Sequence, residues 1–147
     1  MNARLFAFFI ATLLFLPISY AQIPSVAESY IDGDVPEAKD FKPFLVRDLT
    51  TYLKRKLGEG VIVDYELLRD VPTQVGVASP KFYLWLKAIK PDKTVIEGAA
   101  RVAALDKKEF NVTTFLTRDE IRAKPDDLAR IFPKALIEKI RAKAGIQ

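Results

Sequence analysis

A long amphipathic stripe constrains the fold of this chain more than any other feature. Apolar residues recur every three or four positions between Asp40 and Gly58, as they do on a helix that buries one face. The stripe consists of Phe41, Phe44, Leu45, Leu49, Tyr52, Leu53 and Leu57. We expect Asp40 to cap the start of this helix and Gly58 to end it. Such a helix needs a second apolar surface to pack against.

Four segments after the helix predict β-strands, and apolar and polar residues alternate most clearly in the first and the last of them. Turn-forming residues separate the segments, and this favours an antiparallel meander. The expected strands cover residues 61–69, 82–89, 94–105 and 110–116. In the last of them, we expect Phe110, Val112 and Leu116 to share one face because side chains alternate along a strand.

After Thr117 the pattern changes to short helical turns and a final helix over residues 134–144. Thr117 and Glu120 have the spacing of a capping box, which predicts where this helical tail begins. The apolar face of the last helix consists of Leu136, Ile137 and Ile140. We therefore expect an α+β fold, with one long helix packed across a four-stranded antiparallel meander and a helical C-terminal tail.

Small residues occupy the centre of the third expected strand, at Gly98, Ala99 and Ala100. Small side chains in a strand allow a helix or a ligand to approach the sheet closely. We expect the long helix to be the element that approaches, and a bound ligand is the alternative.

The first 21 residues have the layout of a secretory leader. Arg4 supplies a positive start, an apolar run covers residues 5–16, and small residues precede a cleavage site after Ala21. The run is too short for an ordinary membrane span, so we expect cleavage, with an uncleaved N-terminal anchor as the alternative. The exported protein would be periplasmic or secreted. It would have an extended arm over residues 22–39, a single domain over residues 40–147 and no stable membrane span.

The chain contains neither cysteine nor histidine. This composition excludes disulfides, thiol nucleophiles, Ser-His-Asp triads and histidine-ligated metals. We therefore expect a protein that is not an enzyme and has no catalytic residue, metal or cofactor. The net charge is +4, with both signs mixed along the chain, which is typical of a solvated surface rather than of a nucleic-acid interface.

The second expected strand is apolar or aromatic on both faces. One face carries Tyr83 and Trp85, and the other carries Phe82, Leu84 and Leu86. Tyr83 and Trp85 are candidate binding residues if their face is exposed. The alternative, which we favour, is that the C-terminal helix covers them, because it is the remaining element with a free apolar face.

The link between the first two strands reads Thr73-Gln74-Val75-Gly76-Val77-Ala78, and the arm contains Gly33. Together with the order of elements, these residues resemble the cystatin-like proteins over roughly residues 22–116. The resemblance implies a roll in which the arm and two hairpin loops form a wedge that enters the cleft of a papain-type protease. Gln74, Val75 and Gly76 are candidate binding residues. Their spacing differs from the family's Gln-x-Val-x-Gly motif, and the second hairpin has no Pro-Trp.

Two carboxylates, Asp64 and Glu66, share one face of the first strand, with Lys87 and Arg101 on neighbouring strands. Such a pair can share a proton or form ordinary cross-strand ion pairs. The first hypothesis is an exported non-enzymatic binding or accessory protein that acts on a protein or cell-envelope partner. A cystatin-like inhibitor of a hydrolase is the alternative, and a carboxylate-dependent enzyme is the weaker one. The oligomeric state stays open.

Overall fold

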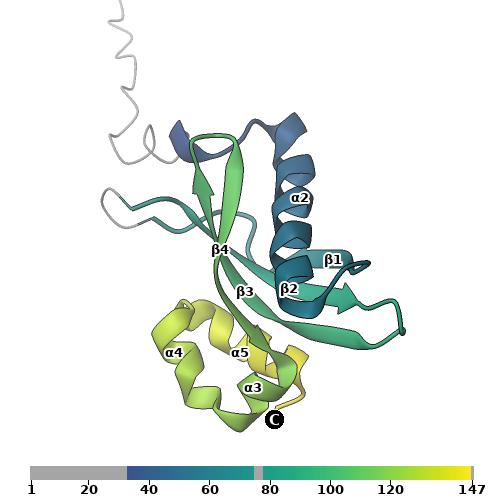
Figure 1. Cartoon of the computed structure of the whole chain (residues 1–147). Helices are drawn as coiled ribbons and strands as arrows, with labels where there is room; N and C mark the ends of the chain where they lie inside the picture. The colour runs from purple at the N-terminus through teal and green to yellow at the C-terminus, as the bar shows by residue number, and fades with distance from the viewer. Residues whose placement is uncertain (1–32, 75–77, 147) are drawn as a thin grey trace, which may run out of the picture.

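The computed structural model describes residues 33–74 and 78–146 and has the expected α+β architecture. One long helix precedes four strands and a set of short helices (Figure 1). The elements are α2 (Ala38–Leu57), β1 (Ile62–Leu67), β2 (Lys81–Ile89), β3 (Val95–Leu105), β4 (Glu109–Thr117), α3 (Arg118–Ala123), η1 (Pro125–Asp127), α4 (Leu128–Ile131) and α5 (Lys134–Ala144). The predicted leader lies outside the described residues, so its cleavage stays a prediction. No helix in the described part is both long enough and apolar enough to cross a membrane.

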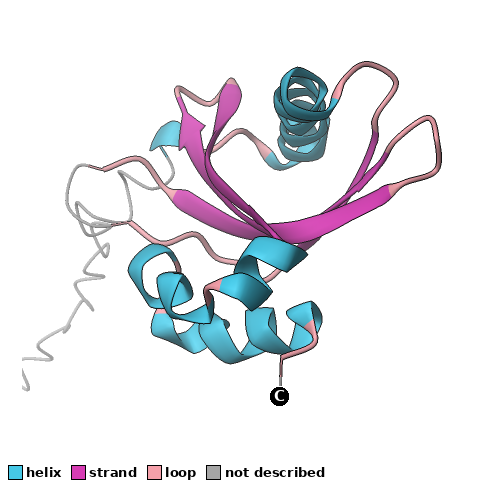
Figure 2. Cartoon of the chain, turned by 60° about the horizontal axis from the view of Figure 1, so that its bottom comes forward, coloured by secondary structure: helices cyan, strands magenta, loops and turns pink. Residues whose placement is uncertain are grey.

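The four strands form one sheet in the order β1-β2-β3-β4, and each neighbouring pair is antiparallel. Trp85 in the middle of β2 lies between Glu66 of β1 and Ala99 of β3. Figure 2 shows α2 against one face of the sheet and the short C-terminal helices gathered on the other. Each face of the sheet therefore has its own apolar core.

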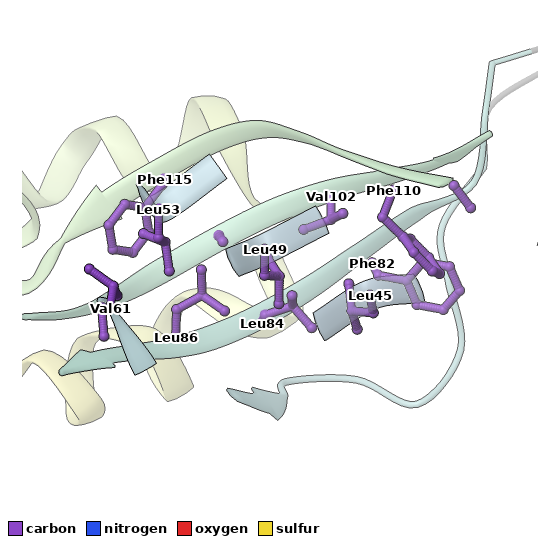
Figure 3. Packing of buried hydrophobic residues seen from close by; sticks show 13 residues of the cluster. Leu45, Leu49, Leu53, Val61, Phe82, Leu84, Leu86, Val102, Phe110 and Phe115 are labelled. Atoms are coloured by element: carbon purple, nitrogen blue, oxygen red, sulfur yellow. The ribbon is translucent and has the colours of Figure 1, made fainter. Parts of the chain in front are cut away.

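The first core, which we call the α2-face cluster, lies between α2 and the sheet. Leu45, Leu49 and Leu53 of α2 are completely buried in it and point toward the strands (Figure 3). Its remaining buried members are Val61, Phe82, Leu84, Leu86, Ala88, Ala100, Val102, Ala104, Phe110 and Phe115. The amphipathic stripe is thus the inner face of α2, as its spacing predicts.

The second core, which we call the tail-face cluster, lies between the sheet and helices α3 to α5. It consists of Leu68, Tyr83, Trp85, Ala99, Ile121, Leu128, Phe132, Leu136, Ile140 and Ala144. Thr117 and Glu120 form the predicted capping box at the start of α3. The helical tail is therefore an integral layer of the domain.

The start of α2 differs from the expectation that Asp40 caps it. The helix begins at Ala38, and Glu37 is the capping residue without a side-chain hydrogen bond. The main-chain N–H groups of Asp40 and Phe41 both donate to the carbonyl oxygen of Glu37, at 2.8 and 2.9 Å. Backbone bonds thus close the first turn before Asp40 can act as a cap. Gly58 ends the helix as predicted, with a φ of 102°.

The expected face of β4 is wrong at its C-terminal end. Phe115, not Leu116, joins the α2-face cluster, while Leu116 packs against the tail-face cluster. The cause is an irregularity in the β3–β4 register: Val102 pairs with Val112, but the preceding Arg101 pairs with Thr114. The extra residue in β4 reverses the alternation of side chains beyond that point.

Candidate functional site

Tyr83 and Trp85 lie under the C-terminal helices. Their exposed fractions are 5% and 7%, and both belong to the tail-face cluster. The Tyr83 hydroxyl is 2.6 Å from Thr73 Oγ1, and the Trp85 ring lies 5.9 Å from Lys143 Nζ of α5. The interpretation that the tail covers this row therefore agrees with the structure, and the row is core rather than an open platform.

The other candidate residues lie in the link between β1 and β2. Val75 and Gly76 are outside the described residues, so their role stays a prediction. Gln74 is half-buried, and within the described part of the chain its side-chain amide has no hydrogen-bond partner. Thr73 anchors the described part of the link, because it exchanges two backbone hydrogen bonds with Lys81 at 2.7 and 2.9 Å.

An apolar groove, which we call the arm groove, lies where the arm and this link meet the sheet. Its volume is about 460 Å³. It is lined by Val35, Pro36, Ala38, Phe41, Leu67, Asp70, Pro72 and Phe82. Phe41 and Phe82 form its aromatic wall, with ring centroids 5.0 Å apart. Val71, between two lining residues, is 59% exposed.

Three segments that are far apart in sequence meet at this end of the molecule (Figure 1). The N–H of Lys107, in the β3–β4 hairpin, donates to the carbonyl oxygen of Asp34 in the arm at 3.0 Å. The N–H of Ala104 in β3 donates to Pro80 at the end of the link at 2.9 Å. Arm, link and hairpin are therefore held together by backbone bonds.

The two carboxylates of β1 are engaged separately. Glu66 binds Lys143 at 2.5 Å and Lys139 at 3.5 Å, both from α5. Its hydrogen bond with Lys143 lowers the pKa of Glu66, whereas a general acid near neutral pH needs a raised pKa. Asp64 accepts the N–H of Tyr65 at 2.9 Å. Glu66 is therefore part of a surface ion-pair network with α5, whereas Asp64 makes a local bond to the backbone.

The two basic residues expected near these carboxylates form no ion pair with them, although Lys87 lies opposite Asp64 in the β1–β2 register. Arg101 instead donates to Thr113 Oγ1 at 3.0 Å and to the carbonyl oxygen of Ile131 at 3.3 Å. Residues 33–74 and 78–146 contain no group of three or more acidic side chains that could hold a metal ion. The absence of enzymatic activity stays a prediction.

A second cavity of about 490 Å³ lies between the start of β3 and α3. Its charged side chains already pair with one another, since Arg118 binds Glu97 and Arg122 approaches Asp119 at 3.9 Å. Arg122 also donates to the carbonyl oxygen of Ala144 at 2.6 Å. The Arg118–Glu97 pair attaches the helical tail to the sheet, and the bond from Arg122 to Ala144 joins α3 to α5. The arm groove is therefore the better candidate for a contact surface.

Sequence reasoning named the arm and the link but missed Phe41 and Phe82 as groove residues. Both belong to apolar patterns that predict core, and nothing in the sequence separates a core aromatic from one at a rim. Comparison of the chain with protein-family models, curated proteins and solved structures finds no match. The resemblance to cystatin-like proteins stays an expectation.

Proposed function

We propose that this chain is an exported, non-enzymatic binding protein that holds a protein partner in the arm groove. The observation that carries the proposal is an open groove with mainly apolar walls, beside a valine that is 59% exposed. A concave, mainly apolar surface with a few polar groups is the usual form of a binding site. The predicted leader supports a partner in the cell envelope or outside the cell.

The lining of the groove indicates the chemistry of the partner. Asp70 is the only charged residue among the described residues that line it, and no ion pair of the described part includes Asp70. The acidic residues Asp34 and Asp40 lie in the adjoining segment, in which Glu37 already pairs with Lys39 at 3.1 Å. A partner segment with an aliphatic or aromatic side chain beside a lysine or arginine would complement both features.

Site-specific photo-crosslinking tests this proposal in the exporting cell. A photoreactive residue at Val71 is expected to capture one protein, while the same residue at the exposed Ala129 of α4 should capture none. With the captured protein, Asp70→Lys should weaken binding about tenfold, because it replaces attraction by repulsion at the rim. The matched change Asp126→Lys should leave the affinity unchanged. Identical crosslinking from Val71 and Ala129 would show that the groove is not the contact surface.

A cystatin-like inhibitor of a hydrolase is the second candidate function. The convergence of arm, link and hairpin at one end of the molecule favours it, since a wedge needs these three segments side by side. Titration of papain with the purified protein distinguishes the two functions. Stoichiometric inhibition would support the wedge, and full papain activity in the presence of excess protein would remove this candidate.

A further inference from the structure

The two edge strands of the sheet, β1 and β4, differ in how many of their outward backbone groups are capped. At the β4 edge, Asp48 of α2 accepts the N–H of Phe110 at 2.7 Å, and Arg47 donates to the carbonyl oxygen of Lys108 at 2.7 Å. The irregularity opposite Arg101 interrupts the same strand further along. Side-chain caps and irregular pairing are the devices with which proteins prevent strand addition at an edge. The β4 edge is therefore capped at its hairpin end and interrupted at the irregularity.

The β1 edge has few such devices. Leu68 donates its N–H to Tyr83 of β2 at 2.9 Å, so by antiparallel alternation Val63, Tyr65 and Leu67 direct their backbone groups away from β2. β1 contains no proline or lysine, and its pairing with β2 is regular. In the described part of the chain, the one side chain that caps this edge is Asp64, which accepts the N–H of Tyr65.

The side chains of β1 also leave apolar surface uncovered. Val63, Tyr65 and Leu67 pack against the α2-face cluster but stay only half-buried. Ile62, on the opposite face of the strand, is 66% exposed. β2, in contrast, is buried over most of its length. One further strand beside β1 would bury these side chains and use the free backbone groups.

We propose that this strand is β1 of a second copy of the chain, paired antiparallel about Tyr65. In that register Val63 of each copy lies opposite Leu67 of the other, and the two Tyr65 side chains meet at the centre. The apolar order of the edge residues therefore matches itself, as a two-fold interface requires. Ile62 lies opposite the other copy's Leu68.

The charges on β1 and α5 also favour a second copy of the chain at this edge. Asp64 of one copy lies opposite Glu66 of the other, and Glu66 is already bound by Lys139 and Lys143. One carboxylate with two ammonium groups carries a net positive charge, so Asp64 meets attraction rather than repulsion. Asp64 releases the N–H of Tyr65 to the new strand and turns toward these lysines. In the single chain Asp64 thus caps the free N–H of Tyr65 at the edge, and in the dimer it binds Lys139 and Lys143 of the other copy.

Sedimentation equilibrium of the exported protein over about 1 to 300 µM tests the proposal. This range suits the weak association that is expected of an interface at the small end of the usual size range. The expected result is a reversible monomer–dimer equilibrium. Val63→Pro should abolish the dimer without breaking the pairing of β1 with β2, because the N–H that it removes points to the open edge. Circular dichroism checks that this variant is folded.

Two further variants test the proposal if Val63→Pro does not fold. Asp64→Lys should weaken the dimer about tenfold or more, because it places a positive charge against Lys139 and Lys143 of the other copy. Glu138→Lys makes the same charge change on the exposed surface of α5 and should have no effect. A wild-type protein that stays monomeric at about 300 µM overturns the proposal. So does a dimer that is unchanged in folded Val63→Pro or in Asp64→Lys.

Discussion

Truncation of either central leucine of α2 is expected to cost a large part of the stability of the domain. Leu49→Ala and Leu53→Ala should each lower the free energy of unfolding by about 2–5 kcal/mol. Both side chains are 0% exposed and lie in the middle of the α2-face cluster, where sheet residues surround them (Figure 3). The rigid sheet limits how far the cavity can collapse, so the cost should lie within this range rather than below it.

Urea denaturation followed by circular dichroism measures this loss. Thr51→Ala is the matched control, because Thr51 lies on the exposed side of the same helix, and it should change the free energy of unfolding by no more than about 0.5 kcal/mol. A leucine variant as stable as this control would mean that the stripe is not buried, and the assignment of α2 as the inner helix would be wrong.

Gly98→Ala is expected to destabilise the domain by about 3 kcal/mol or more, although it adds a single methyl group. A Cβ atom at Gly98 would lie 2.0 Å from the carbonyl oxygen of Leu116 and 2.8 Å from Thr117 Cα. These are backbone atoms of β4, which pairs with Gly98 directly, so no flexible side chain can move aside. Relief of the clash requires separation of β3 from β4.

Thermal unfolding of Gly98→Ala and Gly33→Ala tests this effect. Gly33 is the matched control, since a Cβ atom there would meet no atom within 4 Å. We expect a large fall in the midpoint for Gly98→Ala and little change for Gly33→Ala. Equal midpoints would contradict the close approach of β4 to Gly98. The small residues of β3 thus serve two neighbours: Ala100 faces α2, as expected, and Gly98 makes room for the backbone of β4.

Local patterns in the sequence predict most of the fold. The spacing of Leu45, Leu49 and Leu53 identifies the inner face of α2, and apolar segments bounded by turn residues identify all four strands. The capping box at Thr117 marks the start of the tail because its signal lies within four consecutive residues. The predicted start of α2 at Asp40 is wrong because main-chain bonds to Glu37 determine where the helix begins.

Features that depend on contacts between distant segments could not be predicted. The extra residue in β4 that sends Leu116 to the tail face has no local signal, since bulges accept ordinary residues. The arm groove brings together Phe41, Leu67 and Phe82, which come from three different elements. The exposure of Val71 does not follow from its residue type, and neither do the caps on the β4 edge. The covering of Trp85 could be predicted, because a strand apolar on both faces needs two partners.

The helical tail closes the second face of the sheet, and we therefore propose the arm groove as the main contact surface. The fluorescence of Trp85, the only tryptophan, tests it most directly. In the intact protein we expect blue-shifted emission and weak quenching by acrylamide, because Trp85 is 7% exposed beneath α5. Deletion of residues 134–147 should shift the emission to the red. Water-like emission from the intact, folded protein would contradict the claim and make the Tyr83–Trp85 face the leading candidate for the binding site.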